Sequence, residues 1–152
     1  MRLARDWGLV ILWMAVIFWG SSRSVLPGPL ADTTAGGDLL RSAVHVAEYA
    51  ILAALTGRAA TASAERRHAD PDYGVLRFRR LPDRRLVISV LMIAAGYALF
   101  DELHQSFVPG RCFSLVDLTL DIVGAVLALG LMVRLRERAG QAFDRRQRGF
   151  WR

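Results

Sequence analysis

A dense group of ionisable side chains follows one of the apolar runs of the sequence. The run from Leu86 to Phe100 is mostly apolar, and Asp101, Glu102 and His104 come directly after it. Carboxylates and imidazoles are the groups that move protons or bind cations in proteins. Charge on a membrane-spanning helix is costly and is usually kept for a function. The chemistry of the protein is therefore expected near this point.

Polar side chains recur at helical spacing in two other segments. In each segment, offsets of three and four place three residues on one helix face. The first set is His45, Glu48 and Tyr49, and the second is Asp117, Asp121 and Gly124. Three helices would thus each contribute polar groups.

These groups suit two kinds of catalysis. With a bound divalent cation they could activate a water that hydrolyses an ester, an amide or a phosphoester. Without a metal, a carboxylate–His pair could act as a general base. The spacing completes no known metal motif, so enzymatic activity stays open and a divalent cation is only a candidate cofactor. The candidates for catalysis and for metal binding are His45, Glu48, Asp101 and His104, and those for ligand binding are Tyr49, Glu102, Gln105, Arg111, Asp117 and Asp121.

A simpler role for the same groups is to hold helices together. Polar side chains that pair across transmembrane helices stabilise a bundle without any reaction. One such pairing needs two or three partners, whereas these segments offer two histidines and up to five carboxylates. The excess of acids favours a site for protons, a cation or a polar substrate.

Four apolar runs predict an all-α, polytopic membrane bundle. Hydrophobic residues make up 53% of the chain, and its mean hydropathy is +0.28. With their flanks, the runs each reach about 17–22 residues, enough to cross a bilayer. A soluble four-helix bundle is disfavoured because the aromatic residues of the first run leave no polar face. Transmembrane helices are expected over about residues 6–21, 38–59, 85–107 and 114–135.

The distribution of arginine predicts the orientation of these helices. All 20 basic residues are Arg, and the net charge is +6. They concentrate before the first run, between the second and third, and after the fourth. By the positive-inside rule, both termini, a loop over about residues 60–83 and a basic tail over 136–152 are cytoplasmic. Membrane orientation explains the charge, so nucleic acid is not expected as a partner. The first run also fits a cleaved signal peptide.

The polar residues of the three helices share one depth. With a rise of about 1.5 Å per residue, Glu48, Asp101 and Asp121 lie roughly 10 Å below the outer helix ends. Facing lipid, each would cost several kcal/mol, so these groups are expected to face inward. Pro109 and Gly110 should turn the chain sharply. Arg111 is then expected to pair with Asp101, Glu102 or Asp117.

The combined motifs resemble the VanZ-like family of small bacterial membrane proteins. The resemblance covers about residues 10–135 and rests on His45-Val-Ala-Glu48-Tyr49, Asp101-Glu102-Leu-His104-Gln105, Pro109-Gly110-Arg111, Asp117 and Gly124. It implies a four-helix transmembrane domain over residues 1–135, a bacterial plasma membrane location and a link to tolerance of the glycopeptide teicoplanin. It implies no particular reaction. Asp121 departs from the pattern, because such sequences commonly have Asn there, and an ionised carboxylate cannot donate a hydrogen bond.

Three functions compete on these grounds. The first is an outward-facing polar site that engages a lipid-linked or peptidoglycan-related ligand, where Arg111 binds an anionic group through two hydrogen bonds. The second is a membrane-embedded, metal-dependent hydrolase or transferase that acts on an envelope substrate. The third, a proton-coupled carrier, is weakened by the absence of inverted repeats. In each case the membrane lipids are expected partners.

Overall fold

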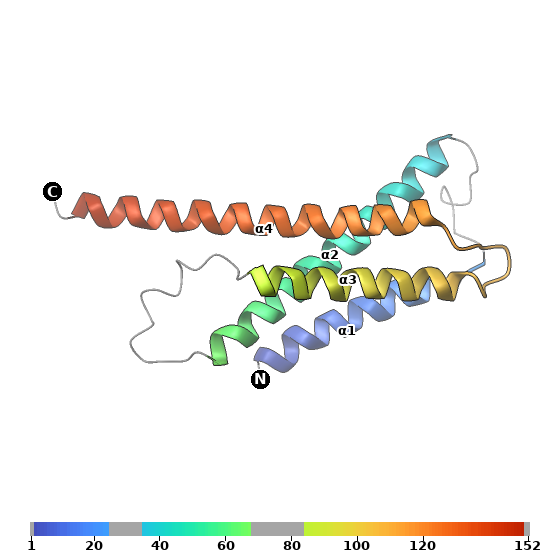
Figure 1. The fold of residues 1–152 in the computed structure, drawn as a ribbon, viewed down its shortest axis with the longest axis horizontal. Coiled ribbons are helices and arrows are strands. Elements are labelled where there is room, and N and C mark those ends of the chain that lie inside the picture. The colour runs from blue at the N-terminus through green and yellow to red at the C-terminus, as the bar shows by residue number, and fades with distance from the viewer. Residues whose placement is uncertain (1, 25–34, 68–83, 151–152) are drawn as a thin grey trace.

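The computed structural model describes residues 2–24, 35–67 and 84–150, which form four helices (Figure 1). Helix α1 spans Arg2–Ser21, α2 spans Ala35–Arg67, α3 spans Arg84–Gln105 and α4 spans Leu115–Phe150. The expected all-α fold class is therefore confirmed.

Helix α2 is longer than the sequence predicted. It was expected to end near Ala59, but it continues to Arg67, so residues 60–67 are helical and not part of a loop. The segment holds mainly Ala, Ser and Thr and contains no Gly or Pro that would stop a helix. The rest of the expected loop, residues 68–83, lies outside the described residues.

Helix α4 is also longer than predicted, since it continues past Leu135 to Phe150. The extension is rich in Arg and also contains Gln and Ala, which favour helix whether or not a bilayer surrounds them. Its first turn is capped by Ser114, whose Oγ accepts a hydrogen bond of 3.1 Å from the backbone N–H of Asp117. Loss of hydropathy after Leu135 thus marked the end of the apolar segment and not the end of the helix.

All four helices are long and apolar enough to cross a membrane. Large apolar side chains point outward, and Trp19, Met92 and Leu131 are 63%, 68% and 57% exposed. An exposed apolar surface of this extent is unfavourable in water and is expected in contact with lipid. The candidate spans are Leu3–Ser21, Gly37–Arg66, Arg84–Gln105 and Leu115–Ala142.

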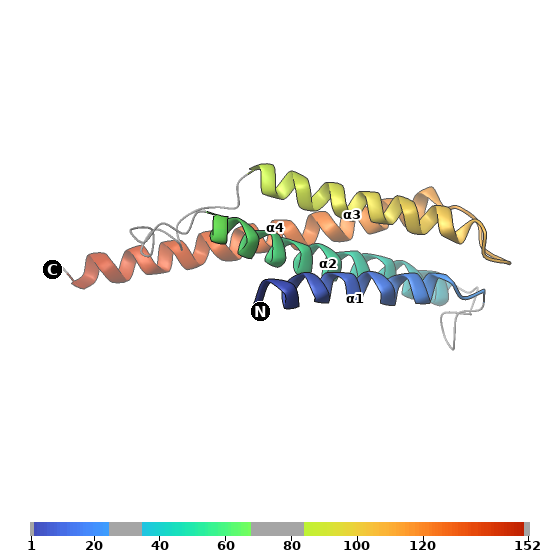
Figure 2. The ribbon, with the colours of Figure 1, turned by 90° about the horizontal axis from the view of Figure 1, so that it is seen from below.

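The helices form a bundle in which α2 contacts each of the other three. The end of α1, the start of α2 and the connection from α3 to α4 lie at one end of the bundle, at the right of Figure 1; we call it the loop end. The start of α1 and the C-terminal half of α4 lie toward the other end, where α4 extends well beyond its neighbours. Figure 2 shows α1 and α2 side by side, as their contacts require.

A glycine allows α2 and α4 to pack closely near the loop end. A Cβ atom at Gly124 would overlap the carbonyl oxygen of Val46 and would lie 3.0 Å from the Val46 Cα. Small residues in membrane bundles allow backbones to approach in this way. Because Val46 follows His45 and Gly124 lies one turn after Asp121, the close approach also brings these two polar side chains together.

Helix α1 is attached to α2 and α3 along its length. Four of the side-chain hydrogen bonds that make these attachments are 2.5 to 3.0 Å long, and their donors are indole, phenol and guanidinium groups. They join Trp13 to the carbonyl of Glu48, Tyr97 to the carbonyl of Met14, Arg58 to Asp6, and Trp7 to Ser63.

Candidate functional site

A histidine and an aspartate from two helices meet at the loop end. His45 Nδ1 of α2 lies 2.9 Å from Asp121 Oδ1 of α4. The His45 side chain is 7% exposed and that of Asp121 is 0% exposed. A buried charged group is retained only with a partner, and each of these two groups provides one for the other.

Glu102 of α3 joins this pair. Its side chain is fully buried, and its Oε2 accepts a hydrogen bond of 2.8 Å from the backbone N–H of Ser114. One potential ligand atom each from His45, Glu102 and Asp121 lies within 4.8 Å of the other two. We call these three residues the buried triad. Of the four residues expected as metal ligands, His45 alone belongs to this group among the described residues.

Asp101 makes a separate polar contact between α3 and α1. Its Oδ2 accepts hydrogen bonds from Ser21 Oγ at 2.7 Å and from Gln105 Nε2 at 2.9 Å. Gln105 therefore holds an acid in place through the helical offset of four. Ser21 was not among the expected residues, although a hydroxyl at the end of an apolar helix was a signal for it.

Several buried polar atoms of the site have no hydrogen-bond partner among the described residues. They belong to side chains that are at most 1% exposed. An unsatisfied buried polar group costs about 1–3 kcal/mol, so native proteins keep few of them. The atoms are Tyr49 Oη, Asp101 Oδ1, Glu102 Oε1 and Asp121 Oδ2. Their presence on neighbouring helices indicates that the site has unused binding capacity.

His104 lies against α1 and not in the buried triad. Its Nε2 is 3.0 Å from Ser22 Oγ, and its ring centroid is 4.4 Å from that of Phe18. The helical offset placed His104 and Asp101 on the same side of α3, and each of them contacts a serine at the end of α1 or just after it. The structure therefore does not bring His104 to His45.

The prediction that Arg111 forms an ion pair with an acid of the site is wrong. Among the described residues, no carboxylate lies within ion-pair distance of Arg111. Its Nη1 instead donates a hydrogen bond of 3.1 Å to the carbonyl of Ser21, one of the carbonyls that a helix end leaves without an intrahelical partner. The turn itself is as predicted, since Gly110 adopts a φ of +80° that favours glycine.

Arg41 is another arginine at the loop end, and it was not among the expected site residues. It lies one turn before His45 on α2, and its Nε is buried without a partner among the described residues. The offset of four from His45 was the available signal.

Glu48 and Asp117 are partly buried. Neither side chain forms a hydrogen bond or an ion pair with another residue in the described part of the chain. Both lie one turn from a member of the buried triad, Glu48 on α2 after His45 and Asp117 on α4 before Asp121. They therefore place two further carboxyl groups near the triad that form no hydrogen bond or ion pair with the described residues.

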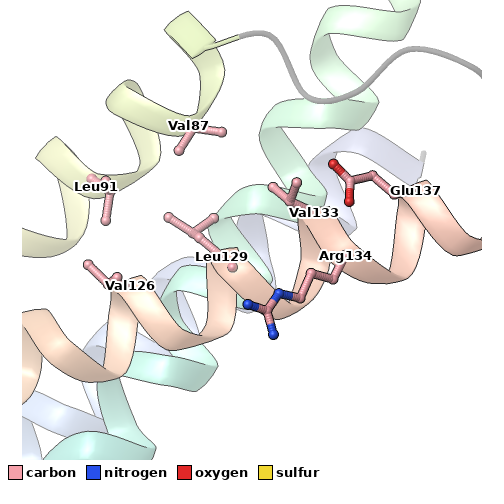
Figure 3. Close-up of a pocket in the computed structure, with 8 residues that line it drawn as sticks. Val87, Leu91, Val126, Leu129, Val133, Arg134 and Glu137 are labelled. Carbon is pink, nitrogen blue, oxygen red and sulfur yellow. The ribbon is translucent and has the colours of Figure 1, made fainter.

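A groove of about 440 Å³ lies between α3 and α4, toward the other end of the bundle (Figure 3). Its walls are mostly apolar, and charged groups appear only where Arg134 and Glu137 follow the apolar part of α4. The lining residues are Val87, Leu91, Val126, Leu129, Gly130, Val133, Arg134 and Glu137. None of the candidate site residues lines it, so the polar site and this groove are separate.

The comparison with protein families agrees with the resemblance noted in the sequence. A family model described as VanZ/LLP1 matches residues 7–136, a range that includes the buried triad. Searches of curated proteins and of solved structures found no match. Because the family match covers most of the chain and all four helices can span a bilayer, the chain belongs to the VanZ/LLP1 family and is a multi-pass membrane protein.

Proposed function

We propose that the protein binds an anionic, lipid-linked precursor of the cell envelope at the loop end and thereby contributes to tolerance of glycopeptides such as teicoplanin. The observation that carries this proposal is the state of two arginines. Among the described residues Arg41 Nε has no hydrogen-bond partner and Arg111 uses a backbone carbonyl, although several acids lie at the same end of the bundle.

Guanidinium groups in this setting favour an anionic ligand. Leaving a charge without a counterion in a water-poor environment is costly. A phosphate or a carboxylate matches the planar guanidinium through two parallel hydrogen bonds. Arg111 retains donors that its single bond to Ser21 does not use, and Arg41 lies near the start of α2, at the same end of the bundle.

The expected orientation supports an envelope ligand over a cytoplasmic one. Described arginines such as Arg66, Arg84 and Arg134 lie toward the opposite end of the bundle, and by the positive-inside rule this supports a loop end that faces outward. Lipid-linked precursors that are displayed outside would reach this end through the outer leaflet. The VanZ-like resemblance supplies the connection to teicoplanin.

The test is teicoplanin tolerance in a bacterial host that lacks its own copy of the gene. Arg41→Ala and Arg111→Ala should each lose tolerance at normal membrane abundance. Arg111→Lys should also lose it, because an ammonium group lacks the planar fork. Arg23→Ala is the matched control, since Arg23 lies at the same end but its guanidinium carbon already sits 3.9 Å from the Trp19 ring centroid. Full tolerance from the Arg41→Ala/Arg111→Ala double variant would refute the proposal.

A second candidate function is a membrane-embedded hydrolase or transferase. The buried His45–Asp121 pair favours it, because a carboxylate that orients an imidazole is an arrangement used in general base catalysis. Purified protein in lipid nanodiscs would be incubated with a lipid-linked precursor, and product release would be followed. Turnover that His45→Gln removes would support an enzyme. Binding of the precursor without turnover would support the binding proposal and count against an enzyme.

A further inference from the structure

Three helices converge on one buried group of potential metal ligands. His45 comes from α2, Glu102 from α3 and Asp121 from α4, and their ligand atoms lie within 4.8 Å of one another. Ligand atoms on one zinc ion are about 3.3–3.6 Å apart, given bonds of about 2.0–2.2 Å in a tetrahedral arrangement. The side chains would therefore need to draw together by no more than about 1.5 Å.

The two acids of the buried triad have oxygen atoms that nothing else in the described residues satisfies. Glu102 and Asp121 are both 0% exposed, yet Glu102 Oε1 and Asp121 Oδ2 lack hydrogen-bond partners. Two buried carboxylates beside one imidazole leave an excess of negative charge, which is unfavourable in a low-dielectric interior. A divalent cation would satisfy both oxygens and neutralise that excess.

One of the potential ligands, Glu102, is already held by an outer hydrogen bond. Metal-binding carboxylates are usually held by an outer hydrogen bond that fixes their direction. The backbone N–H of Ser114 makes such a bond to Glu102 Oε2 at 2.8 Å and leaves Oε1 for an ion. Gly124 brings α2 against α4 and so brings the imidazole of His45 to Asp121.

We infer that His45, Glu102 and Asp121 bind a divalent transition-metal ion of the Zn²⁺ type. The imidazole indicates which class of metal ion would bind, because Mg²⁺ and Ca²⁺ take oxygen ligands, whereas Zn²⁺ and Mn²⁺ also accept nitrogen. Three protein ligands leave a coordination position open, as in catalytic zinc sites. The metal site stands apart from the proposed anionic-ligand site, since it uses neither Arg41 nor Arg111.

The test measures zinc binding directly. Full-length protein, purified in detergent with its affinity tag removed, would be stripped with EDTA, equilibrated with Zn²⁺ and analysed by mass spectrometry for bound metal. Wild type should hold stoichiometric zinc, and Glu102→Gln and Asp121→Asn should each weaken zinc binding by at least tenfold. Asp38→Asn, which changes an exposed acid on α2, is the matched control and should bind like wild type.

Circular dichroism separates loss of metal from loss of fold. Both substitutions keep the side-chain shape, and Glu102→Gln keeps an acceptor for Ser114, so the variants should retain helical spectra. If Asp121→Asn does not fold, Glu102→Gln carries the test. Wild type that holds no more zinc than Glu102→Gln would overturn the inference. Zinc binding without glycopeptide tolerance would leave the metal site standing and count against the proposed function alone.

Discussion

Replacing Gly124 with alanine should weaken the contact that assembles the polar site. The added methyl carbon would lie 3.0 Å from the Val46 Cα and would overlap the Val46 carbonyl oxygen. Carbon atoms prefer separations of about 3.5–4.0 Å, so α2 must move away from α4 by about 0.5–1 Å. Overpacking of this kind costs about 1–3 kcal/mol. Alanine in a helix gains about 1 kcal/mol over glycine, which offsets part of that cost.

Gly130→Ala is the matched control that removes the helix-propensity term. Gly130 lies on the same helix, and a Cβ there would meet nothing within 4 Å. Both variants gain the same propensity, so the difference between them isolates the contact with Val46. We expect Gly124→Ala to be less stable than Gly130→Ala by about 1–3 kcal/mol, measured by SDS unfolding in mixed micelles with circular dichroism. Equal stability of the two variants would refute the close-packing argument.

Three further predictions test orientation and local energetics. Exposed Cys112 should react with an impermeant maleimide in intact cells, whereas a cysteine placed at Arg66 in a Cys112→Ser background should not; the reverse pattern would invert the topology. Ser114→Ala should lower the free energy of unfolding by about 1 kcal/mol by removing the cap of α4, and an unchanged value would show that the cap adds nothing. Asp6→Asn should cost only about 0.2–1 kcal/mol, because its partner Arg58 is 52% exposed; a clearly larger loss in the same assay would show that the pair is better shielded than this exposure indicates.

The fold could be predicted from the sequence because the membrane-spanning helices of a protein are visible as apolar runs in its hydropathy. Each apolar run became one helix, and the outward-facing residues such as Met92 are those that lipid accepts. The helix ends did not follow, because α2 and α4 continue into polar segments. Beyond Ala59 and Leu135, helix propensity and not hydropathy decides where the chain stops being helical.

The membership of the polar site could be predicted better than its pairings. Burial of His45, Asp101 and Asp121 followed from the cost of charge in lipid. The partner of each group depends on helix rotation and crossing, which the sequence did not give. His45 contacts Asp121 because Gly124 allows the backbone of α2 to approach α4 closely. Arg111 was expected to pair with an acid, but it donates a hydrogen bond to a backbone carbonyl.

The hydrogen bonds of α1 constrain how the protein is made. Asp101 depends on Ser21, and Tyr97 depends on the carbonyl of Met14, so α3 relies on a helix that emerges from the ribosome well before it. Release of α1 by a signal peptidase would remove the acceptor of the Tyr97 hydroxyl and one of the two donors to Asp101, which would keep only Gln105. Each lost hydrogen bond inside a bilayer would cost about 1–3 kcal/mol. We therefore expect that α1 is not cleaved from the chain and that it remains beside the translocon until α3 is inserted. The first helix would then serve as a template for the third during biogenesis.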